Sequence, residues 1–170
     1  MVKIIVEDGD MTSILGNINI EKWEVVIDEF KDKIANCEML LEMFSPDAPD
    51  FDKEICEEKG WDDKTRICIE NNLKANKIML AFKKLNLLLF KCVLDNKDLS
   101  KLLPLLKIKY EDNFSASLEL LQDQVDTSYI DEGEYLEIAN DMKLRYDETF
   151  EKIKIFEKIA DGCEFDIEDE

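Results

Sequence analysis

The residues of this chain that could do chemistry are carboxylates and thiols. The sequence has 170 residues, with 41 Asp and Glu, five Cys and no His. Without histidine it lacks the usual general base near neutral pH, the base of a Ser-His-Asp triad and a common zinc ligand. The thiols occur singly, with no CxxC pair, at Cys37, Cys56, Cys68, Cys92 and Cys163. This pattern favours buried, reduced cysteines in a cytoplasmic or otherwise intracellular protein.

Carboxylates can also bind calcium, so the acidic run DQVDTSYIDEGEYLE was compared with the ligand spacing of an EF-hand loop. A loop that begins at Asp126 would place Ile130 at the fifth position and Asp131 where the sharp turn needs glycine. The spacing therefore fails. No glycine-rich phosphate-binding loop is present in the sequence either. We expect no metal, no other cofactor and no catalytic residue, and so a protein that is not an enzyme.

Two segments of the chain concentrate its negative charge. Residues 45–65 contain eight acids and three lysines, and residues 122–141 contain seven acids and no base. In an up-down-up-down helical bundle, both segments would connect helices at the same end. They would form an acidic pole there with a charge of about −12. The candidate partner-binding residues of this acidic pole are Asp47, Asp50, Asp52, Glu54, Glu57, Glu58, Trp61, Asp62, Asp63, Asp123, Asp126, Asp131, Glu132 and Glu134.

The acidic pole suits a basic protein partner better than nucleic acid itself. The whole chain has a formal charge of −19 at pH 7, which repels phosphate backbones and disfavours binding to anionic membranes. Carboxylates held on rigid helices could instead imitate a phosphate backbone. We therefore hypothesise an inhibitor or antagonist of a basic partner, with nucleases and other nucleic-acid-handling proteins as the expected class. The alternative is that the acids only solvate the surface.

Trp61, in the run KGWDD, is the best candidate for an aromatic anchor at the acidic pole. Aromatic side chains are enriched among the residues that dominate binding energy at protein interfaces. The alternative interpretation is that Trp61 covers the end of the bundle core.

A cationic, apolar stretch, KLNLLLFKCVLDNKDLSKLLPLLKIK, lies at the centre of this acidic chain. Residues 72–109 contain nine lysines and two aspartates. If Ala75, Phe82 and Leu89 occupy heptad position a, the helix has a second apolar face on its opposite side. One interpretation is a central helix covered on both sides, with lysines reaching water. The other is a structural or assembly subunit, such as a homodimer, that self-associates through the second face, formed by Leu73, Leu80, Leu87 and Leu94.

Four amphipathic segments with apolar residues at steps of three and four must position these groups. The first stripe begins at Trp23 and the last ends at Ala160, and Asp131 with Glu134 has the spacing of a capping box. Pro104 suits the first turn of a helix better than its interior. The sequence therefore predicts a short turn at 97–102, and long helices over residues 19–44, 62–94, 104–126 and 131–162.

The predicted fold class is all-α, an antiparallel bundle of about four long helices. We expect one domain over residues 1–162, with an N-terminal arm or hairpin at 1–18 and an acidic tail at 163–170. The acidic connector at 45–61 should contain one short helical turn, around residues 53–58. The longest apolar run, LNLLLF, is too short for a transmembrane helix, so we expect no membrane span.

Overall fold

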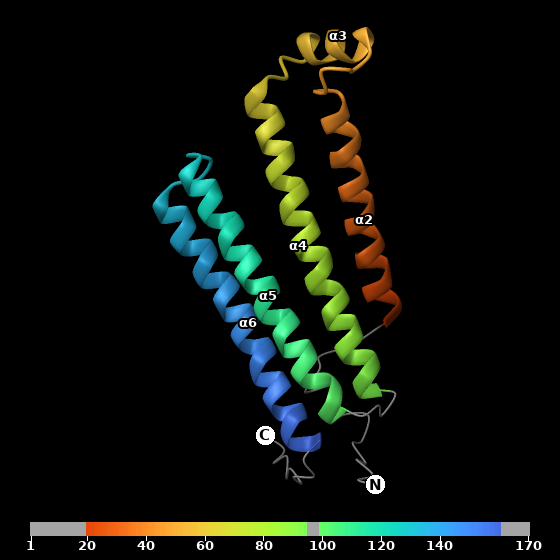
Figure 1. Ribbon diagram of the computed structural model, residues 1–170, viewed down its shortest axis with the longest axis vertical. Coiled ribbons are helices and arrows are strands. Elements are labelled where there is room, and N and C mark those ends of the chain that lie inside the picture. The colour runs from red at the N-terminus through yellow and green to blue at the C-terminus, as the bar shows by residue number, and fades with distance from the viewer. Residues whose placement is uncertain (1–19, 95–98, 161–170) are drawn as a thin grey trace.

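The computed structural model describes residues 20–94 and 99–160, which form five helices and no strand. The helices are α2 (Ile20–Glu42), α3 (Asp50–Glu58), α4 (Asp63–Leu94), α5 (Leu99–Asp126) and α6 (Glu132–Ala160) (Figure 1). The all-α prediction is confirmed. The predicted N-terminal arm at 1–18 and acidic tail at 163–170 lie outside the described residues.

The four long helices form an antiparallel bundle in which packing follows the order of the chain. Helix α2 packs on α4, α4 on α5, and α5 on α6. Figure 1 shows α4 between α2 and α5, while the short helix α3 lies across the end of the α2–α4 pair. Over the described ranges, no helix is long and apolar enough to cross a membrane.

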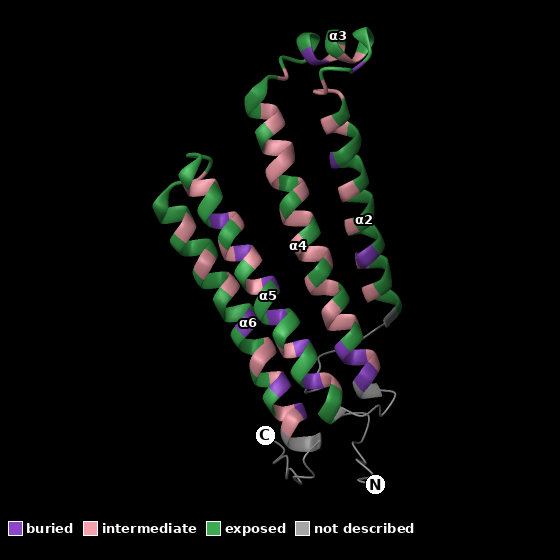
Figure 2. Cartoon of the chain, in the orientation of Figure 1, coloured by how far each residue is buried: buried purple, intermediate pink, exposed green. Residues whose placement is uncertain are grey.

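The hydrophobic core is concentrated at one end of the bundle. Figure 2 shows the buried residues of α4 gathered near its C-terminal end. From Asp63 to Leu88, no residue of α4 is fully buried. The acidic pole, at the other end, therefore stands on the less densely packed half of the bundle. The core cluster consists of Leu89, Phe90, Cys92, Leu103, Leu106, Tyr110, Tyr146, Ile153 and Phe156.

A cluster of hydrogen-bonded polar side chains lies where α4, α5 and α6 meet. Asn113 Nδ2 donates to the carbonyl oxygen of Ile78 over 3.1 Å, and the Tyr146 hydroxyl donates to Asn113 Oδ1. The Tyr110 hydroxyl donates to Asn86 Oδ1 over 2.7 Å. Because these polar groups have partners, their burial is compatible with a stable core. Burial also raises the pKa of Tyr110 and of Tyr146 above the ordinary value of 10.0, since it disfavours the charged phenolate.

The predicted apolar stripes agree with the observed burial. Ile27 and Cys37 of the first stripe, and Ile153 and Phe156 of the last, are buried. The remaining described members of these two stripes are at least half-buried. Spacing alone therefore identified the inner faces of α2 and α6, because residues three and four apart lie on one side of a helix.

One local prediction was wrong, and another was right in place but too short. The helix predicted to begin at Pro104 begins at Leu99 and continues through the proline. Pro104 is exposed while Leu103 and Leu106 are buried, so core packing on one side outweighs the missing amide donor on the solvent side. The single turn expected within 45–61 is the nine-residue helix α3. It begins directly after Pro49, whose fixed φ suits the start of a helix.

Candidate functional site

Helix α3 supplies the first half of the acidic pole, and buried residues fix its position. Cys56 of α3 and Ala48, two residues before the helix, are buried. The helix ends in a Schellman motif: Gly60 N–H donates to the Glu57 carbonyl and Trp61 N–H to the Cys56 carbonyl, over 3.1 and 2.8 Å. Gly60 has φ of +65°, a conformation that glycine adopts without strain. The acids of α3 are thus held on a helix with a defined end.

The α5–α6 turn supplies the second half and has the same construction. Tyr129 N–H donates to the Gln124 carbonyl over 2.8 Å, and Ser128 has φ of 57°. The predicted capping box at the start of α6 is confirmed. Asp131 Oδ1 accepts from Glu134 N–H over 2.8 Å, and Glu134 Oε2 accepts from Asp131 N–H over 3.1 Å.

Replacing Ser128 with glycine should stabilise the protein. Ser128 occupies the left-handed region that costs a residue with a Cβ about 1–2 kcal/mol, so we expect a gain of about 0.5–1 kcal/mol after the added chain entropy of glycine. Urea unfolding followed by circular dichroism measures the change. Gly60→Ala is the matched control and should have the opposite sign, because the Cβ meets no atom within 4 Å and only the backbone is strained. A loss of stability in Ser128→Gly would contradict this account of the turn.

The two halves of the acidic pole lie at the same end of the molecule. Figure 1 shows α3 across the end of the α2–α4 pair, the α5–α6 turn toward the same end but set back beside α4, and the last described residues of α6 at the other end. A direct contact links the α5–α6 turn to α4, since Tyr129 Oη lies 3.3 Å from Cys68 Sγ. Cys68 is only about 8 Å along α4 from its first residue. Segments about 60 residues apart in the chain therefore contribute to one surface.

Most acids of this surface are exposed and form no ion pair with a described residue. Asp52 is half-buried and the other candidate carboxylates are exposed. Asp63 pairs with Arg66 over 3.6 Å. Among the residues that the structure describes, no ion pair involves Asp47, Asp50, Asp52, Glu54, Glu57, Glu58, Asp123, Asp126 or Glu132.

Asp62 has a structural task within the acidic pole. Its Oδ1 accepts hydrogen bonds from Thr65 N–H and Lys64 N–H, over 3.2 and 3.1 Å, and so caps α4. These bonds, that from Thr65 above all, lower the pKa of Asp62 below its ordinary value because they favour the carboxylate. Asp62 therefore serves the fold by capping α4, as Asp131 and Glu134 do by capping α6.

Two aromatic residues stand on the α3 half of the acidic pole, and they differ in exposure. Trp61 is half-buried, and Lys59 Nζ lies 4.6 Å from the centre of its ring. Phe51 is 63% exposed, at the outer side of α3. We did not single out Phe51 from the sequence, because a nine-residue helix there was not expected. Spacing on that helix would have identified it, because Cys56 marks the inner face and Phe51 is neither three nor four residues from Cys56.

The leucines proposed as a self-association face lie on the side of α4 that faces α2. Phe90 packs edge-on against Trp23 of α2 at 5.5 Å between ring centres, and Lys77 pairs with Glu38 of α2 over 3.2 Å. Leu87 is three residues before Phe90, and Leu80 is three residues after Lys77. Because residues three apart share one side of a helix, both leucines lie on the side of α4 that faces α2. Leu73, Leu80 and Leu87 are half-buried, and the side chain of Leu94 lies outside the described residues. Helix α2 therefore occupies the side that a second copy would need.

The comparisons with known proteins give no independent indication of function. The chain matches no family model, and no curated protein or solved structure is significantly similar to it. Within residues 20–94 and 99–160, no three Cys, Asp or Glu side chains form a group that could hold a metal ion. The four described cysteines are free thiols, and Cys37, Cys56 and Cys92 are buried.

Proposed function

We propose that this protein is a non-enzymatic binding module that presents its acidic pole to a basic protein partner. The observation that carries the proposal is that two acidic segments lie toward the same end of the molecule, with most of their carboxylates exposed and in no ion pair among the described residues. Such a surface attracts a basic partner over distance and accelerates its association. The exposed ring of Phe51 supplies an apolar contact amid these charges, and it could stack on an arginine guanidinium.

The partner class we favour is a nucleic-acid-handling protein, with this protein acting as its inhibitor or antagonist. Surfaces that bind nucleic acid carry clustered arginine and lysine, spaced to meet phosphates. Carboxylates on α3, at the start of α4 and at the α5–α6 turn are held by capped helix ends, so their spacing is rigid. A rigid anionic surface could occupy such a site in place of phosphates, which would make inhibition competitive with nucleic acid.

Neutralising the acidic pole should weaken binding to an arginine-rich probe. The variant carries Glu54→Gln, Glu57→Gln, Glu58→Gln and Asp123→Asn, which leave every cap and ion pair of the pole in place. Its affinity for a labelled nona-arginine peptide at about 50 mM salt should fall about tenfold, measured by fluorescence anisotropy. The native protein should lose affinity steeply when the salt is raised to about 300 mM, and the variant less so.

The matched control removes the same four charges elsewhere on the bundle. Glu29→Gln, Asp32→Asn, Glu111→Gln and Glu148→Gln change exposed residues of α2, α5 and α6 that make no ion pair with a described residue. This control should keep most of the affinity. Equal losses in both variants would mean that net charge alone attracts the peptide, and would contradict a binding site at the acidic pole.

Self-association is the alternative function, and light scattering separates it from the proposal. A protein that acts through the acidic pole should have the monomer mass of 19.9 kDa at both salt concentrations. An assembly subunit held by apolar contacts should instead be a dimer at low salt and remain one at high salt. A dimer at both concentrations, dissociated by Leu80→Glu with Leu87→Glu, would overturn the proposal.

A further inference from the structure

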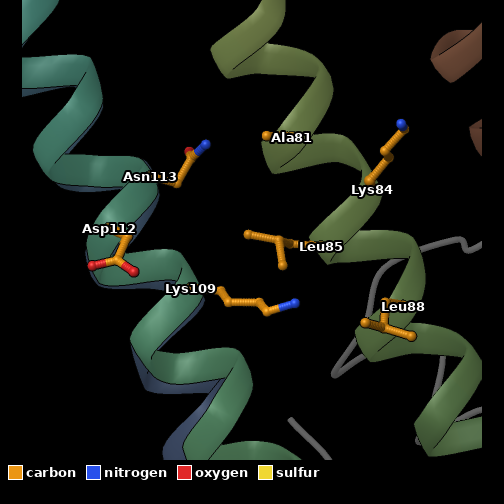
Figure 3. Close-up of a pocket in the computed structure, with 7 residues that line it drawn as sticks. All are labelled: Ala81, Lys84, Leu85, Leu88, Lys109, Asp112 and Asn113. Atoms are coloured by element: carbon orange, nitrogen blue, oxygen red, sulfur yellow. The ribbon is translucent and has the colours of Figure 1, made fainter.

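The surface between α4 and α5 contains an open groove that the acidic pole does not use. It has a volume of about 510 Å³ and is lined by residues of α4 and α5. Figure 3 shows Leu85 of α4 and Lys109 of α5 pointing into the space between the helices, and Leu88 of α4 lies beside this space. Lys84 and Asp112 stand at its margins. The groove therefore combines an apolar floor with charged edges.

Exposed apolar side chains extend this groove toward the start of α5. Leu88 is 43% exposed, Leu105 58% and Ile108 55%. Leu85 and Lys109 line the same groove from antiparallel helices, so Leu105, four residues before Lys109, lies opposite Leu88. Three large apolar residues exposed along one strip are more than isolated surface leucines, and they favour a surface that is covered by another segment.

The charges at the groove indicate what kind of segment would cover it. Lys84 and Lys109 form no ion pair with any residue of the described ranges, although the chain carries an overall charge of −19. Asp112 is the one acid among the lining residues. Apolar side chains flanked by two unpaired lysines suit a peptide in which apolar and acidic residues alternate.

We propose that residues 161–170 of this same chain dock into the α4–α5 groove. Their sequence, DGCEFDIEDE, alternates apolar and acidic side chains at Cys163 to Ile167, with six acids and no base. Phe165 and Ile167 would cover the strip at Leu88 and Leu105, and the neighbouring carboxylates would meet Lys109 and Lys84.

The reach of the segment supports this assignment. Tyr146 of α6 bonds to Asn113 of α5, and the two helices run antiparallel, so Ala160 at the end of α6 is level with the start of α5. Lys109 lies about 15 Å farther along α5. Phe165 and Ile167 are five and seven residues beyond Ala160, so an extended segment carries them up to about 17 and 23 Å from it. This reach is enough to pass around the start of α5 and meet Leu105 and Leu88. A segment attached to the same chain also has a high effective concentration at its site.

Paramagnetic broadening in the full chain tests the proposal. A nitroxide is attached at Cys163 in a Cys68→Ser background, since the remaining thiols, at Cys37, Cys56 and Cys92, are buried. The methyl signals of Leu85, Leu88, Leu105 and Ile108 should lose more than about half of their intensity at low salt, and recover it at high salt. Methyl signals at the far end of α2, those of Leu40 and Leu41, should be unaffected.

Charge reversal separates docking at the groove from general attraction. Lys84→Glu with Lys109→Glu should restore the groove signals, and Asp112→Asn should deepen their loss. The matched control, Lys33→Glu with Lys143→Glu, makes the same change of charge at exposed positions away from the groove and should leave the broadening unchanged. Circular dichroism confirms that each variant is folded.

Three results would overturn the proposal. The groove signals could keep their intensity in the labelled native chain, or both charge-reversed proteins could lose the broadening equally. Broadening could also appear only when labelled protein is mixed with isotope-labelled, spin-label-free protein, which would assign the groove to a segment of a second copy.

Discussion

Replacing Phe156 with alanine should lower the free energy of unfolding by about 3–5 kcal/mol. Phe156 is 1% exposed and belongs to the core cluster formed by α4, α5 and α6. Truncating Phe156 loses the transfer free energy of the ring and leaves a cavity. Leu103, Leu106 and Ile153 are also buried in the close-packed core, so they cannot easily move to fill that cavity. A single domain of this size is stable by only about 5–15 kcal/mol, so the variant should unfold at a much lower urea concentration.

Phe51→Ala is the matched control for this prediction, because it makes the same chemical change on an exposed side chain. Phe51 is 63% exposed, and its replacement should change the free energy of unfolding by no more than about 0.5 kcal/mol. Both variants are compared by urea unfolding at one pH and salt concentration. Similar losses in the two variants would mean that the core is not concentrated where α4, α5 and α6 meet.

The second large effect concerns stability at alkaline pH. Burial raises the pKa of Tyr110 well above its ordinary value of 10.0, so the folded protein retains the hydroxyl proton where the unfolded chain releases it. The contribution of this pKa difference to the free energy of unfolding is fully present below pH 10 and is lost as the pH rises above 10. The loss should amount to about 1.4 kcal/mol per pH unit for this one group.

Tyr110→Phe should reverse its effect between neutral and alkaline pH. At pH 7 the variant lacks the hydrogen bond to Asn86 and should be less stable than the native protein by about 1 kcal/mol. Near pH 11 it should equal or exceed the native protein, because phenylalanine has no proton to release. Urea unfolding at both pH values measures the crossing. Tyr135→Phe, at a half-buried position outside the core cluster, is the control, and its effect on stability should not reverse between the two pH values. Parallel stability curves for the native protein and Tyr110→Phe would contradict the prediction.

The apolar spacing of the sequence was sufficient to predict the long helices. The stripe from Trp23 to Leu41 and the stripe from Tyr135 to Phe156 lie on the inner faces of α2 and α6. The caps at Asp62 and Asp131 were also predictable, since a capping carboxylate acts on amides within one turn. These features depend on residues close together in the chain.

The predictions failed where long-range packing opposed a local preference. Pro104 favours a helix start, yet α5 begins five residues earlier because Leu103 and Leu106 are buried in the core. Residues 45–61 look like a solvated acidic connector, yet Ala48 and Cys56 are buried, and Cys56 Sγ lies 4.0 Å from the carbonyl oxygen of Met43, just beyond the end of α2. This packing supports helix α3. The exposure of Phe51 follows from that helix, so it was missed with it.

By itself, the sequence determined the helices, their inner faces and the concentration of negative charge in two segments, because periodicity and composition are local properties. Only the tertiary structure decided how α4 uses its two apolar faces. One faces α5 and α6 through Phe82 and Leu89, and the other faces α2 through Phe90. A helix with two apolar faces can be covered by its own chain or by another copy with similar gain in buried area. Which of these occurs depends on where the neighbouring helices are placed, and no spacing within α4 records that placement.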